Sequence, residues 1–315
     1  MMNDGLLGIA RLALTAVQNL SFAVLVGILL SDRWLARSPS AWQAGVSRNL
    51  GRAFKAGAVV ALLSGVGEFW IHCALMGESS LMDAAPAVRS MLSETEFGQA
   101  WAIGAALMLC VAVVSFVPAT GRATRFEPIL WLALAGFALS KSHGGHPVDA
   151  GAFSLPVWAD LVHLLAISAW VGIVWVAAFM VAPKMAEAPF TDRRNGAAFV
   201  QSLSYAATVA LVALIVTGAY NGWRGVSSPA NLFASWYGQV LILKLALVLV
   251  AAALGGHNRF FEMPHLLASL KNPSSMSPAR PLRRFATVLH VESWVLAGVL
   301  VAAAVLVSSP LPGTS

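Results

Sequence analysis

Long apolar stretches alternate with short polar segments along the whole chain. A helix needs about 20 apolar residues to cross the hydrocarbon core of a bilayer, and most of these stretches have that length. We count eight of them, at residues 6–30, 56–76, 99–118, 128–142, 156–182, 199–220, 237–255 and 286–308, of which the fourth is the shortest. The pattern predicts an all-α fold, a polytopic integral membrane bundle of about eight transmembrane helices.

The polar segments are too short to form a separate soluble domain. Residues 1–315 are therefore expected to make one transmembrane domain, with short helices in the loops 77–98, 221–236 and 256–285. The N-terminus has no basic segment and no small-residue cleavage site, so the first span is predicted to be a retained helix. Small residues that suit close helix contacts are Gly65, Gly67, Gly218 and Gly222.

Composition and charge support the membrane assignment and give it an orientation. The chain is 58% hydrophobic and 11% charged, with a mean hydropathy of +0.75. Fifteen of the 20 basic residues lie between spans one and two, three and four, five and six, or seven and eight. The positive-inside rule then predicts that both termini face out, which is the periplasm if the membrane is a bacterial inner membrane. The net charge of +6 thus reflects topology, and a nucleic-acid partner is not expected.

Ionisable and sulfur-bearing side chains in the second span form one stripe. Glu68, His72 and Met76 recur at i, i+4 and i+8, so they line one face of a helix. A thioether favours Cu(I) and an imidazole accepts either oxidation state, which makes this stripe a candidate copper site. The alternative is that Met76 only packs and that Glu68 and His72 form a buried hydrogen-bonded pair. Cys73 is adjacent but faces another direction, and its depth differs from that of Cys110, so no disulfide between them is expected.

A second polar group lies where the loop after span four enters span five. His143 and His146 flank two glycines, and Asp160 and His163 are one helical turn apart. All four could bind the same copper ion, although a solvated turn is an equal interpretation of the two loop histidines. Asp160 could instead orient His163 or cap its helix.

The two polar groups lead to two expectations about contacts. Spans two and five should face each other and bring His72 close to His163, because both imidazoles must avoid lipid. Lys244 should neutralise Glu68 or Asp160, since an unpaired ammonium in a bundle is costly.

The amino-acid sequence of the second half of the chain resembles the CopD/PcoD family of copper-resistance membrane proteins. The segment ADLVHLLAISAWVGIVW carries that family's Asp-x-x-His, followed by Trp-x-Gly. Spans six and seven carry its Thr-Gly, Tyr-Gly, Leu-Lys and Asn-Arg pairs, and the last span is similar to its Glu-bearing helix. The resemblance is strongest over residues 130–312.

This resemblance implies an inner-membrane protein of copper homeostasis, with copper ions as cargo. It also implies a possible separate periplasmic partner of the CopC type, because the sequence ends without such a domain. There is no P-loop and no phosphorylatable Asp motif of a pumping ATPase, so ATP-driven transport and enzymatic activity are not expected. Two alternatives remain. One is a haem-binding redox protein using pairs such as His72 with His163 or His257 with His290, and the other is a membrane scaffold that docks a periplasmic copper protein.

Overall fold

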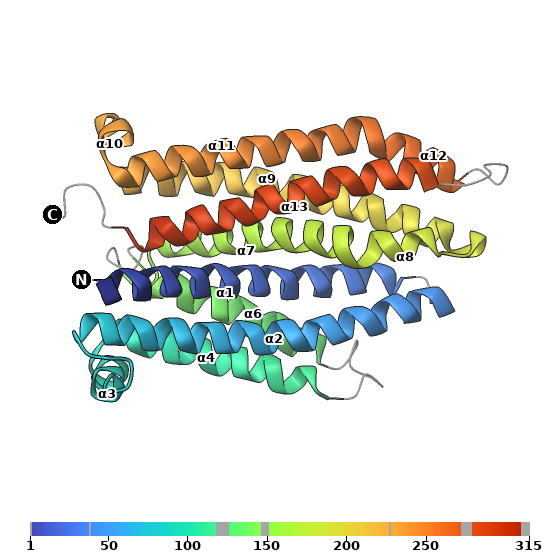
Figure 1. The fold of residues 1–315 in the computed structure, drawn as a ribbon. Helices are drawn as coiled ribbons and strands as arrows, with labels where there is room; N and C mark the ends of the chain where they lie inside the picture. Colours follow the sequence, from blue (N-terminus) through green and yellow to red (C-terminus); the bar gives the residue numbers. More distant parts are fainter. Residues whose placement is uncertain are drawn as a thin grey trace.

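The computed structural model describes residues 2–37, 39–117, 126–145, 151–226, 228–271 and 279–309. These residues form helices joined by short connections, and no strand occurs among them (Figure 1). The long helices are α1 (Met2–Leu35), α2 (Ala41–Met76), α4 (Glu96–Ser115), α6 (Glu127–His143), α7 (Leu155–Val176), α9 (Arg193–Val226), α11 (Trp236–His257) and α13 (Ala279–Val307). The predicted all-α bundle is confirmed.

Seven helical segments are long and apolar enough to cross a membrane, by length and composition. The eighth predicted span corresponds to α6, which has 17 residues and is about 26 Å long at 1.5 Å per residue. Helix α6 runs beside α4 through the bundle (Figure 1). The short fourth stretch of the sequence is therefore a helix within the bundle, as predicted.

The loops contain the short helices that the sequence allows. They are α3 (Ala85–Glu94), α10 (Pro229–Ala234), α8 (Ala182–Ala186) and α12 (Met263–Lys271), with a 3-10 turn at Phe190–Asp192. Helices α7 and α11 each pass through one π-helical turn, at Ala177–Val181 and Asn258–Glu262. In each case a proline, Pro183 or Pro264, follows two residues later. Proline lacks an N–H and disturbs the regular ladder, which accounts for a wider turn just before it.

Helix α1 lies in the middle of the bundle, between α2 and α7 (Figure 1). Its closest approach is to α7, where Gly27 and Gly172 meet backbone to backbone, and a Cβ added to either would overlap the other helix. These two glycines were missing from the predicted set. Of that set, Gly65 leaves room for Gln18, and Gly218 lies against His163.

Burial separates central from peripheral helices. The most apolar window of the span that begins with α7 is 67% buried, whereas that of the span formed by α11 and α12 is 11% buried. The core is built around Trp170 of α7, Leu25 of α1 and Leu296 of α13, all at most 2% exposed. Helix α11 instead presents leucines and valines outwards, as a lipid-facing helix does.

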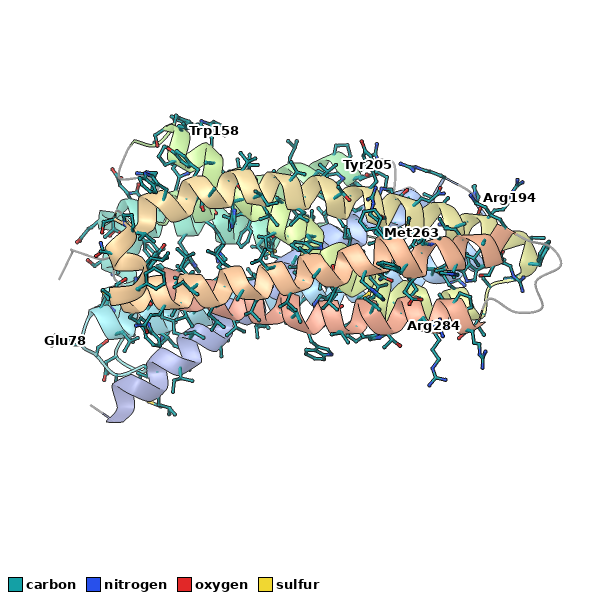
Figure 2. The ribbon with its side chains drawn as sticks, turned by 90° about the horizontal axis from the view of Figure 1, so that it is seen from above. Glu78, Trp158, Arg194, Tyr205, Met263 and Arg284 are labelled. Atoms are coloured by element: carbon teal, nitrogen blue, oxygen red, sulfur yellow. The ribbon has the colours of Figure 1, made fainter. Side chains whose placement is uncertain are left out.

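The two ends of the bundle differ in charge. The first turns of α1 and the last turns of α13 lie at one end, together with α3 and α10 (Figure 1). Figure 2 shows Glu78 and Trp158 at that end, and Arg194 and Arg284 at the other. We call these the acidic end and the basic end. Cys73 and Cys110 are both free, as predicted.

Candidate functional site

Glu68 of α2 is paired with an arginine of α1. Arg11 Nε donates a hydrogen bond to Glu68 Oε1 at 2.8 Å, and the two side chains are only 21% and 16% exposed. The suggestion that Lys244 neutralises Glu68 is therefore wrong. The guanidinium group of Arg11 already balances the negative charge of this mostly buried carboxylate, so Glu68 does not need a metal ion to neutralise it.

His72 lies one helical turn beyond Glu68 and is packed against aromatic rings. Its ring centroid is 5.1 Å from that of Phe97 on α4, and Phe69 stacks on Trp101 at 3.9 Å nearby. The Nδ1 atom of His72 is buried and has no hydrogen-bond partner among the residues that the structure describes. A buried polar atom without a partner is costly, and a metal-ligand bond is one way to satisfy it.

Met76 follows one turn after His72, at the last position of α2. Its side chain is 63% exposed at the acidic end of the bundle. The stripe of Glu68, His72 and Met76 therefore runs from a partly buried ion pair, past a half-buried imidazole, to an accessible thioether. Both Met82 and the loop around it lie at the same end, and Met82 is 94% exposed.

Lys141 of α6 connects this stripe to α1. Its Nζ donates to Gln18 Oε1 at 2.9 Å and to Asn19 Oδ1 at 3.4 Å, and it interacts electrostatically with Glu68. The amide of Gln18 occupies the space that a side chain at position 65 would fill. Gly65 thus allows a polar α1 residue to reach between α2 and α6.

The next residue of α6, Ser142, belongs to a second polar group. Its side chain interacts with Asp160 of α7, which accepts a hydrogen bond from Asn221 Nδ2 of α9 at 3.4 Å. Lys244 of α11 interacts electrostatically with Asp160. The predicted pairing of Lys244 with Asp160 is thereby supported. Asp160 does not cap α7, because the N-cap position is Ser154.

His163 is oriented by a threonine. Its Nδ1 lies 3.1 Å from Thr217 Oγ1 on α9, and the Thr217 hydroxyl donates to the carbonyl of Ala213 at 2.7 Å. The single hydroxyl hydrogen is thus in use, so Thr217 accepts from His163 Nδ1–H, and the lone pair of the imidazole lies on Nε2. A histidine that binds a metal through one ring nitrogen usually donates the N–H of its other ring nitrogen to an acceptor in this way. Gly218 makes room for the ring, since a Cβ there would lie 3.3 Å from His163 Cε1.

The two groups do not form one site. Helix α1 packs against both α2 and α7, and α2 also contacts span five at its π-helical turn, Ala177–Val181. His72 and His163 have different neighbours, Phe97 and Thr217, so the expected closeness of the two imidazoles has no support from these contacts. Within the described ranges, no three His, Cys, Asp or Glu side chains gather closely enough to hold a metal ion. Lys141 and Ser142, consecutive on α6, join the two groups into one layer, which we call the polar layer.

Of the two loop histidines, the structure describes only His143. His143, at the end of α6, places Nδ1 2.9 Å from its own helix at Leu139 O, and its ring lies edge-on to Phe153 at 6.3 Å. His146 is outside the described residues. Whether these two histidines bind copper stays a prediction.

A separate carboxyl group lies deep in the bundle. Glu292 of α13 is 2% exposed and accepts a hydrogen bond from Trp170 Nε1 of α7 at 3.0 Å. His290 contacts Phe179, whereas His257 stacks on Phe261 and lies 3.6 Å from Glu262. The contacts that these histidines make give the haem alternative no support.

Several residues of the polar layer were missed by sequence reasoning, and most of them lie on α1. Arg11, Thr15, Gln18 and Asn19 recur at i, i+4, i+7 and i+8, which is a polar stripe in an otherwise apolar helix. That spacing could have identified them. Thr217 carried no comparable signal, because a threonine in a transmembrane helix usually bonds only to its own backbone.

Two family models match the chain. The model of the copper resistance protein D-like N-terminal domain matches residues 2–152, and that of copper resistance protein D matches residues 197–306. The chain belongs to the copper resistance protein D family. The resemblance found in the second half of the sequence is confirmed, and the N-terminal half belongs to the same family.

Curated relatives carry matching names. The chain is 28% identical to copper resistance protein D of Pseudomonas syringae pv. tomato, over 75% of this chain and 76% of that protein. It is 27% identical to copper transport protein CutJ of Bacillus subtilis over 71% of this chain, a match that spans only 39% of the Bacillus protein. Inner membrane protein YebZ of Escherichia coli is 21% identical over 83% of this chain. No solved structure matches.

Proposed function

We propose that this protein transfers copper ions across the bacterial inner membrane, using the polar layer as its entry region. The observation that carries the proposal is the buried, unpartnered Nδ1 of His72 in a transmembrane helix. Family membership supplies the association with copper, and the names of two relatives refer to copper transport and copper resistance. By the positive-inside rule, the basic residues support an orientation with the acidic end in the periplasm.

The proposed ligands are neutral. Met76 is the first contact at the accessible end, His72 follows one turn deeper, and His163 Nε2 lies in the second group. Soft thioether and imidazole ligands select Cu(I) over Mg²⁺ and Ca²⁺, which need oxygen ligands. Glu68 and Asp160, which the sequence also suggests as ligands, are assigned the role of balancing nearby positive charge, because each already has a cationic neighbour.

The charges of the polar layer favour transfer over storage. Arg11, Lys141 and Lys244 face only two carboxylates, Glu68 and Asp160, so an arriving cation meets no net negative charge. A copper ion would be held by a few soft ligands and released readily. Storage would instead require a tight site with three or more ligands, and none is present among the described His, Cys, Asp and Glu residues.

A periplasmic copper-binding protein of the CopC type is the proposed donor. The exposed residues Met76 and Met82 lie at the end of the bundle where such a donor would dock. In the scaffold alternative, the same surface would dock the donor but the buried histidines would be dispensable. Variants of His72 and His163 therefore separate the two functions.

The experiment that tests this proposal is metal analysis of the purified protein after loading with Cu(I), followed by washing and competition with a Cu(I) chelator. We expect copper to bind in preference to Zn²⁺ or Mg²⁺ and to be lost when His72 is replaced. The proposal is contradicted if the wild type retains no copper even with the weakest chelator. It is also contradicted if the His72 and His163 variants bind copper as well as the wild type does. A visible absorption spectrum of the same sample tests the haem alternative.

A further inference from the structure

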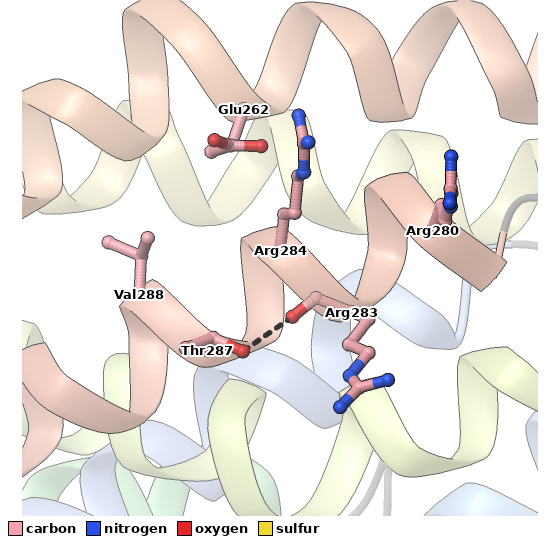
Figure 3. Close-up of a pocket in the computed structure, with 6 residues that line it drawn as sticks. All are labelled: Glu262, Arg280, Arg283, Arg284, Thr287 and Val288. Atoms are coloured by element: carbon pink, nitrogen blue, oxygen red, sulfur yellow. Dashed lines mark hydrogen bonds between the residues drawn. The ribbon is translucent and has the colours of Figure 1, made fainter.

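A pocket lies at the basic end of the bundle, far from the polar layer. Its volume is about 520 Å³, and it lies between the first turns of α13 and the π-helical turn that joins α11 to α12 (Figure 3). The lining residues are Glu262, Arg280, Arg283, Arg284, Thr287 and Val288. No role in copper transfer requires this pocket.

The pocket has a strong excess of positive charge. Its lining residues include three arginines and one carboxylate, Glu262, which lies 3.6 Å from His257 Nε2. The first turn of α13 contains no acidic residue. The N-terminal end of a helix carries partial positive charge, so basic side chains near it are stabilised by a nearby anion.

The arginines are arranged to receive that anion from one side. Arg280 and Arg284 are one turn apart on α13, and both extend towards the α11–α12 side of the pocket, where Glu262 lies (Figure 3). Arg283 extends in the opposite direction (Figure 3). Two guanidinium groups on one helix face offer several N–H donors, a geometry that suits the oxygens of a phosphate group.

The surroundings of the pocket are apolar and exposed. Phe260 and Phe261, which directly precede Glu262, are 71% and 60% exposed, and the span formed by α11 and α12 is the least buried of the seven candidate membrane spans. In a membrane these rings would contact acyl chains just below the headgroup region. A ligand that fits both features has an anionic phosphate head and hydrocarbon tails.

We propose that this pocket binds the headgroup of an anionic phospholipid from the leaflet at the basic end. Arg280 and Arg284 bind the phosphate, and Phe260 and Phe261 contact the acyl chains. The positive-inside rule explains why basic residues gather at this end. It does not explain why two of them converge on a pocket beside exposed aromatic rings. Basic pockets between transmembrane helices are known to hold lipid headgroups in this way.

The test is lipid titration of the full-length protein in neutral detergent, followed by native mass spectrometry. The probes are dioleoyl phosphatidylglycerol, dioleoyl phosphatidylcholine and inorganic phosphate. We expect saturable binding of phosphatidylglycerol that is weakened about tenfold or more in the double variant Arg280→Gln with Arg284→Gln, since each interfacial basic residue contributes about 1 kcal/mol. The matched control is Arg48→Gln with Arg52→Gln, which removes the same charge from exposed positions of α2 at the same end.

A second variant keeps the proposal testable if the double arginine variant does not fold. Glu262→Gln removes the only carboxylate of the pocket and should strengthen phosphatidylglycerol binding. The proposal is overturned if the Glu262 variant binds the lipid no better than wild type. It is also overturned if the α2 control loses as much affinity as the pocket variant, which would indicate general surface attraction, or if inorganic phosphate alone displaces the lipid completely.

Discussion

Replacing His72 by Phe should raise the stability of the metal-free protein and weaken its copper binding. The new ring preserves the contact with Phe97, 5.1 Å away between centroids, and removes a buried nitrogen that has no described partner. Removing an unsatisfied buried polar group should raise the free energy of unfolding by about 1 kcal/mol, the low end of the usual range. For a chain of this size, that gain corresponds to a rise of about 2 °C in Tm.

The same substitution should have the opposite effect when copper is present. At a copper concentration about 100 times Kd, binding stabilises the wild type by about 2.7 kcal/mol. If the loss of the imidazole raises Kd about 100-fold, the stabilisation at that concentration falls to about 0.4 kcal/mol, which is RT ln 2. The copper-dependent rise in Tm should therefore nearly vanish.

The assay is thermal unfolding in detergent with and without Cu(I), with His265→Phe as control. His265 is exposed on α12, and its Nδ1 lies 2.6 Å from its own helix at Phe261 O, so its replacement should change neither measurement. A metal-free His72 variant that is less stable than wild type, together with an unchanged response to copper, would refute the reasoning. The nitrogen would then have a structural role and no ligand role.

Three further predictions follow from the same geometry. Thr217→Val keeps the side-chain shape but removes the acceptor for His163 Nδ1–H, so Cu(I) affinity measured by chelator competition should fall about 10-fold to 100-fold. The control is Thr287→Val at the basic end of the bundle, which loses only a hydrogen bond from the threonine hydroxyl to the carbonyl of Arg283 on the same helix. This control should leave the Cu(I) affinity unchanged, and an equal loss of affinity in both variants would contradict the role of Thr217 in orienting His163. Met76→Leu should lower Cu(I) affinity while leaving Tm within about 2 °C, because the side chain is 63% exposed and its volume is conserved; an unaltered affinity would exclude the thioether. Reporter fusions at Lys55 and Ser315 should report opposite sides of the membrane, and matching signals would rule out the proposed orientation.

The membrane spans could be predicted from the sequence because hydropathy and length decide them. Even α6, at 17 residues, was recognisable as an apolar run ending in Lys141 and His143. Helix starts also followed local rules, as with Pro156 in the first turn of α7. The order of helices around the bundle has no such signal. Nothing in the hydropathy of α1 indicates that it separates α2 from α7 through the contact of Gly27 with Gly172.

That missing information explains the errors at the candidate site. The stripe of Glu68, His72 and Met76 follows from helical spacing alone, and the structure retains it. The partner of Glu68 depends on which helix lies beside α2, so Arg11 could not be chosen over Lys244 from sequence. For the same reason His72 and His163 were placed together, whereas each lies in its own part of the polar layer.

Copper flux into proteoliposomes is the measurement that tests the central claim most directly. Wild type, His72→Phe, His163→Phe and His257→Ala would be reconstituted at equal density, and copper entry would be followed with an enclosed Cu(I) indicator. We predict protein-dependent entry of copper that falls about tenfold or more in the His72 and His163 variants, because each lacks one of the proposed ligands. The His257 variant should match wild type. Entry that is independent of the protein, or that is reduced only in the His257 variant, would contradict the account.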